Sequence, residues 1–186
     1  MRKTQQGGYK SAALPKIYLS FENPPIFISE PRLEEGYMLD FLPIEELLGC
    51  YIPSLKIVIL YDIGLEWYST KRNVNKDLLR AVVLIHEIAH WISHLLPKRG
   101  IKEWPLKFYE DTDINVHEGW AQLLTYWVVD EVDRDIENTF KKLNTNQPAP
   151  YKIYEHFTKY WIEEIMDSLA HLRTLGKPAE LQDWKP

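Results

Sequence analysis

Residues 75–96 read NKDLLRAVVLIHEIAHWISHLL, a stretch without proline or glycine. Asn75 is a residue type that caps helix N-termini, and Pro97 follows the last residue of the stretch. Apolar side chains fall on every side of a helix drawn through these residues, which is typical of a buried helix. The sequence therefore predicts a long central helix, and this helix has to accommodate the polar segment His-Glu-Ile-Ala-His at positions 86–90.

His86 and His90 are four residues apart, so on a helix both imidazoles project from one face, about one turn apart. Polar side chains in a buried helix are costly unless partners satisfy them, and a metal ion does so directly. This spacing is the one in which two histidines hold Zn²⁺ and the glutamate acts as general base and acid on a zinc-bound water. We therefore predict His86 and His90 as metal ligands and Glu87 as the catalytic residue. The alternative is a pair of core histidines with hydrogen-bonded partners.

A catalytic zinc site takes a third protein ligand and keeps a fourth position open. Glu118 is the favoured third ligand, because it opens a second apolar helix, GWAQLLTYWVVDEV, that can return against the first. The small residues Gly119 and Ala121 would let the two helices approach closely near the metal.

Three other side chains compete with Glu118. His94 lies one turn beyond His90, but three histidines at successive turns form a column rather than a cup, so we predict a structural role for it. His117 is adjacent to Glu118 in the sequence, so on a helix its side chain projects about 100° away from that of Glu118. Cys50 lies well upstream and is the weakest candidate. Asp111 and Asp113 precede the second helix and serve either as outer partners of the histidines or as a helix cap.

These residues carry a family resemblance. His86-Glu87-x-x-His90 followed by Glu118-Gly119-Trp120-Ala121 resembles the gluzincins, the zinc metallopeptidases whose third ligand is a glutamate on a later helix. The Glu-Gly-aromatic-Ala element is similar to that of zinc aminopeptidases. The string HEIAHWISH resembles HELGHxxxH of the ImmA/IrrE-like metallopeptidases, which also have a strand-turn-strand like residues 49–61 before the motif. The resemblance covers about residues 45 to 130.

The resemblance implies an α+β, zincin-like fold in which a small N-terminal β-sheet packs on a helical core that contains the HExxH helix. It also implies that Zn²⁺ binds three protein ligands and that a tyrosine or histidine from a later segment stabilises the oxyanion of the tetrahedral intermediate. Tyr151, Tyr154 and His156 lie in suitable positions for this role.

The composition is that of an ordinary globular chain, with 45% hydrophobic and 26% charged residues among 186. The net charge of −5 argues against a general nucleic-acid-binding surface. No apolar run approaches the roughly 20 residues of a membrane span, and the N-terminus lacks the apolar core of a signal peptide. A single cysteine fits a reducing compartment. We therefore expect a soluble, cytoplasmic protein that binds neither nucleic acid nor membrane.

The chain is expected to comprise a loose N-terminal tail, residues 1–14, and a single domain, residues 15–186. Short β-rich runs, turn residues and apolar periodicity predict the elements. We expect strands at 16–21, 25–29, 37–42 and 55–61, a helical turn at 43–48, a loop at 97–113, helices at 75–96, 114–143 and 151–175, and a linker at 144–150.

The predicted function is a zinc-dependent peptidase whose polypeptide substrate binds in extended form, antiparallel to the strand at 55–61. A strand at a sheet edge offers unpaired N–H and C=O groups that such a substrate can use. Two alternatives remain open: a non-catalytic, zinc-stabilised module that binds a protein partner, and a metal-dependent hydrolase of a non-peptide amide or ester.

Overall fold

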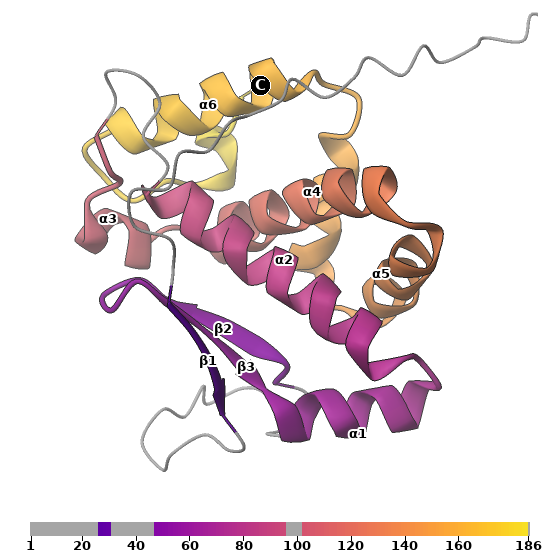
Figure 1. The fold of residues 1–186 in the computed structure, drawn as a ribbon. Coiled ribbons are helices and arrows are strands. Elements are labelled where there is room, and N and C mark those ends of the chain that lie inside the picture. Colours follow the sequence, from indigo (N-terminus) through magenta and orange to yellow (C-terminus); the bar gives the residue numbers. More distant parts are fainter. Residues whose placement is uncertain (1–25, 31–46, 96–101, 186) are drawn as a thin grey trace, which may run out of the picture.

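The computed structural model describes residues 26–30, 47–95 and 102–185, and gives the side chains of all these residues except 26–30 (Figure 1). The predicted tail at 1–14 and the predicted strands at 16–21 and 37–42 lie outside the described residues, as does most of the predicted helical turn at 43–48. Helices dominate the described part, and a small sheet accompanies them, so the α+β class is confirmed.

The sheet has three strands, β1 (Ile26–Glu30), β2 (Gly49–Ile52) and β3 (Ile57–Tyr61), in the order β1-β3-β2. β3 is antiparallel to β2, with Cys50 opposite Ile59, and parallel to β1, with Ile28 also opposite Ile59. The predicted pairing of substrate with the strand at 55–61 is therefore wrong, because β3 has a neighbour on each side and no further strand can add to it.

The central helix forms as predicted: α2 (Lys76–Leu95) begins after Asn75, whose side-chain oxygen accepts hydrogen bonds from the backbone N–H groups of Asp77 and Leu78. No described helix is both long and apolar enough to cross a membrane. The other helical elements are α1 (Asp62–Arg72), α3 (Leu106–Glu110), α4 (Ile114–Val132), α5 (Arg134–Asn146), α6 (Ile162–Thr174) and the 3₁₀ helices η2 (Ala149–His156) and η3 (Leu181–Asp183).

Two long predicted helices are interrupted in the structure. The helix expected at 114–143 ends at Val132, and the extended backbone of Asp133 starts α5, whose first N–H groups donate to the Asp133 carboxylate. The helix expected at 151–175 is instead η2, a turn and then α6. The predicted linker at 144–150 overlaps the end of α5 and the start of η2, and the predicted loop at 97–113 contains α3.

α2 runs through the middle of the molecule, with β2 and β3 against one side and α4 and α5 against another (Figure 1). The indole N–H of Trp120 in α4 donates to the backbone oxygen of Ala89 in α2, at 3.2 Å. At the far end of α2 the buried guanidinium of Arg173 in α6 donates to the carbonyl oxygens of Ile92 and Ser93. A cation at a helix C-terminus is favourable, so α6 fixes the end of the central helix.

Candidate metal centre

Three predicted ligands meet between α2 and α4. Nε2 of His86 lies 3.1 Å from Oε2 of Glu118 and 3.1 Å from Nε2 of His90, and Nε2 of His90 lies 3.6 Å from the same oxygen. Both histidines are buried. Among the described residues, these three form the group whose ligand atoms lie close enough together to hold a metal ion.

The donor atoms of this cluster fit a zinc ion. Zn–N and Zn–O bonds of about 2.0–2.1 Å in a tetrahedron place the ligand atoms about 3.3 Å apart, close to the three separations found here. Two histidine nitrogens that face each other at 3.1 Å can share one hydrogen or can both bind a cation, because only one of them can carry a hydrogen toward the other. A cation accepts both lone pairs, and two imidazoles with one carboxylate are ordinary zinc ligands.

The electrostatics of the cluster separate its two carboxylates. Burial acts to raise the pKa of Glu118, but the charges of His90 and His86 and their hydrogen bonds outweigh it, so the pKa of Glu118 is lowered. Burial raises the pKa of Glu87, against the opposing influence of His86 and His90. The ligand carboxylate is thus held ionised, whereas the adjacent carboxylate favours its protonated form more than usual.

Glu87 lies next to the cluster without being part of it. Its buried side chain accepts a hydrogen bond from the backbone N–H of Tyr51 in β2. β2 can come this close because position 49 is a glycine: a Cβ there would lie 2.8 Å from Cγ1 of Val83 and 3.2 Å from Cγ of Glu87. Sequence reasoning missed this role of Gly49, because nothing in the local sequence shows which helix the strand will meet.

Gly119 has a different neighbour from the predicted one. A Cβ at this position would lie 3.0 Å from Cγ2 of Ile153 and 3.0 Å from a ring carbon of Trp184. Gly119 therefore lets α4 approach η2 and the C-terminal segment, rather than α2.

Of the three predicted oxyanion stabilisers, the structure brings Tyr151 to the cluster. Its ring stacks on His86, with centroids 5.5 Å apart and planes 26° apart, and the Nδ1 atom of His86 is buried without a hydrogen-bond partner among the described residues. Stacking on Tyr151 thus takes over part of the orienting role that a hydrogen bond to Nδ1 usually has. Burial, and then the charges of Glu118 and Glu87, raise the pKa of Tyr151.

The other two candidates lie elsewhere. Tyr154 is part of the core between α4 and α5, where its hydroxyl accepts a hydrogen bond from the side chain of Asn144 at 3.2 Å. His156, at the end of η2, is exposed to solvent.

The rival histidine ligands point away from the cluster. Nδ1 of His94 lies 2.9 Å from the hydroxyl of Tyr51, and its ring also hydrogen-bonds to the backbone of Trp104. Nε2 of His117 donates to the carbonyl oxygen of Tyr109 at 2.7 Å. Burial lowers the pKa of both histidines to about 4, so both are neutral at pH 7.

Two further predicted alternatives are also placed. Sγ of Cys50 lies 3.1 Å from the hydroxyl of Tyr61, and burial raises the pKa of this thiol to about 11, so it is a poor metal ligand. Asp113 is the N-cap of α4, where its carboxylate accepts a hydrogen bond from the N–H of Asn115 at 2.8 Å. The cap interpretation of Asp113 is therefore the one that the structure shows.

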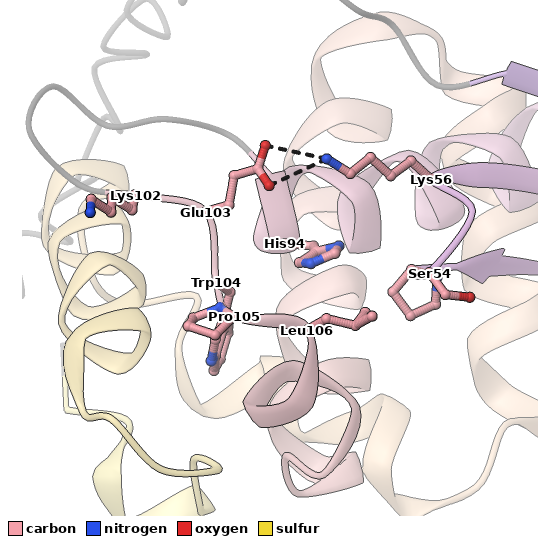
Figure 2. Close-up of a pocket in the computed structure, with 9 residues that line it drawn as sticks. Ser54, Lys56, His94, Lys102, Glu103, Trp104, Pro105 and Leu106 are labelled. Carbon is pink, nitrogen blue, oxygen red and sulfur yellow. Dashed lines mark hydrogen bonds and ion pairs between the residues drawn. The ribbon is translucent and has the colours of Figure 1, made fainter.

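Two cavities lie along α2. One of about 80 Å³ adjoins the cluster, and His86 and Glu87 form part of its wall. The other, of about 650 Å³, lies beyond the cluster at the C-terminal end of the helix, where His94 faces it and the side chains of Lys56 and Glu103 form an ion pair beside it (Figure 2). The smaller cavity is thus the one in direct contact with the candidate chemistry.

Comparison of the chain with protein-family models, with curated proteins and with solved structures finds no match. The function of the protein is therefore inferred from its own residues and their geometry. The features available are a three-donor cluster, a buried carboxylate beside it, a stacked tyrosine and an adjoining cavity.

Proposed function

We propose that the protein is a zinc-dependent peptidase with a zincin-like fold and the ligand set of a gluzincin, His86, His90 and Glu118. The observation that carries the proposal is the convergence of these three donors at 3.1–3.6 Å, with the buried carboxylate of Glu87 beside them and outside the ligand set. A buried carboxylate is costly, and as a non-ligand it needs another role.

Bound zinc supplies a Lewis acid for the substrate carbonyl and lowers the pKa of water. Glu87 takes a proton from the attacking water and delivers it to the leaving amine. Its raised pKa makes its carboxylate a stronger proton acceptor than an ordinary glutamate. The hydrogen bond from the N–H of Tyr51 fixes the direction in which its carboxylate points.

Tyr151 is our choice for stabilising the oxyanion. Its raised pKa keeps the phenol protonated, and its O–H donates a hydrogen bond to the carboxylate of Glu118. A donor already held in place costs little reorganisation when charge develops on the substrate oxygen. The stacking of Tyr151 on His86 places it beside the candidate ligands.

The substrate in this proposal is a polypeptide in extended form, and β2 rather than β3 lies beside it. Among the described strands, β2 is the edge strand that packs against α2, and its Tyr51 N–H already donates to Glu87, which leaves the other edge groups of β2 for a substrate. An outer strand can hold any extended peptide through backbone hydrogen bonds.

The test separates metal binding from chemistry. Glu87→Gln removes a proton acceptor and leaves all three ligands, so the variant should retain about one zinc per chain by elemental analysis. Its hydrolysis of an unfolded protein substrate should fall by about 10²–10⁴-fold. Glu131→Gln, a matched change at an exposed position of α4, is the control and should retain full activity. Undiminished hydrolysis by Glu87→Gln would remove Glu87 from the mechanism.

The alternatives give different results in the same assay. A zinc-stabilised module for protein binding would hold zinc and cleave nothing. A hydrolase of non-peptide amides or esters would act on small substrates and leave peptides intact. The buried Glu87 favours an enzyme over a module, because it is not needed to hold the metal.

A further inference from the structure

The cavity beside the candidate centre has stiff apolar walls. Val82 and Val83 of α2 and Leu143 of α5 line it, and all three are buried in the core. β-branched side chains and packed core residues move little without cost. The apolar part of the wall formed by these three residues is therefore held in place by the core.

The volume limits what can enter. A cavity of about 150 Å³ holds a benzene molecule, and this one measures about 80 Å³. About half the volume of a six-carbon ring corresponds to a group of roughly three heavy atoms. A methyl, hydroxymethyl or isopropyl group fits, whereas a leucine or phenylalanine side chain does not.

The polar wall of the cavity includes two neutral amides, Gln122 and Gln147, besides His86 and Glu87. Nε2 of Gln122 donates to the side-chain oxygens of Asn144 at 3.2 Å and of Gln147 at 2.9 Å, so both of its amide hydrogens are used. The amide nitrogen of Gln147 has no partner among the described residues. No lysine or arginine lines the cavity in the described structure. A charged side chain would lose its hydration among the apolar walls, and no lysine or arginine there would compensate for this loss.

We propose that this cavity receives the side chain of the substrate residue next to the scissile bond and selects one that is small and uncharged: alanine, serine, threonine or valine. The inference rests on the proposed peptidase function and adds the substrate class. We assign the cavity to the residue next to the scissile bond because His86, a predicted metal ligand, and Glu87, the proposed general base, both line it.

The test uses a library of end-blocked peptides in which each position is varied, with cleavage sites read by mass spectrometry. Wild-type protein should cut beside a small uncharged residue at one fixed position. Leucine or phenylalanine at that position should lower kcat/KM by at least 10-fold, because one surplus methylene in an apolar pocket is worth about 10–200-fold.

Leu143→Ala enlarges the cavity and should raise the relative kcat/KM for leucine at that position by at least 10-fold. Leu169→Ala is the matched control, since it truncates an equally buried leucine of α6 that does not line the cavity. It should keep the preference of the wild type, and thermal unfolding of both variants shows whether they are folded.

A second measurement distinguishes this inference from the peptidase proposal. Glu87→Gln protein is titrated with the same peptides by calorimetry, so that binding is measured without turnover. If wild type cleaves peptides, or Glu87→Gln binds them, without a preference for small residues, the inference is overturned and the peptidase proposal is not. Size-dependent binding to Glu87→Gln with no cleavage by wild type supports the cavity and overturns the peptidase. Neither binding nor cleavage overturns both.

Discussion

Two pairs of histidines between α2 and α4 differ in what their nitrogens contact. His86 and His90 point Nε2 atoms at one another and at a carboxylate, 3.1–3.6 Å apart. His94 and His117 instead hydrogen-bond to a tyrosine hydroxyl and to backbone groups of the chain. The nitrogens of the first pair converge with a carboxylate on a point where a cation could bind, and those of the second pair do not.

The pKa values of His90, His94 and His117 differ between the two pairs in the same way. Burial acts to lower the pKa of His90, His94 and His117, but Glu118 raises the pKa of His90 above its usual value. Burial outweighs the influence of Glu103 on His94 and of Glu118 on His117, so the pKa values of these two histidines fall to about 4. Exposure alone does not distinguish the pairs, since members of both are buried. The hydrogen-bond partner of each nitrogen therefore tells more about a histidine's role than its burial does.

The largest expected effect tests the comparison directly. Zinc bound by four protein ligands in small domains is held by about 10–16 kcal/mol, so one ligand is worth on the order of 3–4 kcal/mol. His90→Ala should therefore weaken zinc binding several hundred-fold in a competition assay with a chelator. His117→Ala, the matched change across the interface, should weaken it less than 10-fold. Equal losses in both variants would abolish the distinction between the pairs.

The sequence predicted the first pair well because the information is local. Spacing of four residues in a stretch without proline or glycine puts His86 and His90 on one face, whatever the rest of the chain does. Glu118 followed from the apolar helix that it precedes. The structure places all three together, and their role as metal ligands stays a prediction.

The features that the sequence did not predict depend on distant partners. The segment 114–143 lacks proline, and its glycine, Gly119, lies far from the break. The helix nevertheless breaks at Asp133, because the carboxylate caps a new helix there. The order of strands depends on which segments meet in three dimensions, so β3 was expected at an edge and lies in the middle. The tyrosine hydroxyl that reaches His94 comes from residue 51, far along the chain.

The next effect is on stability. His94→Leu leaves the Tyr51 hydroxyl and a backbone group of Trp104 without the imidazole. An unpaired buried polar group costs about 1–3 kcal/mol, and partial access to water lowers this, so we expect a loss of about 2 kcal/mol in urea unfolding. Zinc content should stay at the wild-type level. Loss of zinc comparable to that of His90→Ala would make His94 a ligand.

The pH dependence of stability sharpens the same point. Well above pH 6.5, His94 is neutral in both the folded and the unfolded chain, so its titration does not lower the stability of the fold there. As the pH falls from 6.5 toward 4, the unfolded chain takes up a proton that the folded chain refuses, so stability decreases. The open cavity beside His94 admits solvent, so we expect about 1.5 kcal/mol rather than the full value of the shift. Metal-free wild type should lose this amount more than metal-free His94→Leu between pH 7 and pH 4.5, and identical losses would contradict it.

The smallest effect concerns one hydroxyl. Tyr51→Phe removes the O–H that lies 2.9 Å from Nδ1 of His94 and keeps the ring that packs edge-on against Tyr109. A single hydrogen bond of this kind contributes about 1 kcal/mol. The stability effects of mutating two residues that share a hydrogen bond are not additive. Tyr51→Phe should therefore lower the free energy of unfolding by about 1 kcal/mol in wild type and by much less in the His94→Leu background. Equal costs in the two backgrounds would show that the hydroxyl acts elsewhere. The same substitution leaves the backbone N–H of Tyr51 on Glu87, so peptide hydrolysis should persist although the strand beside the site has lost a side-chain contact.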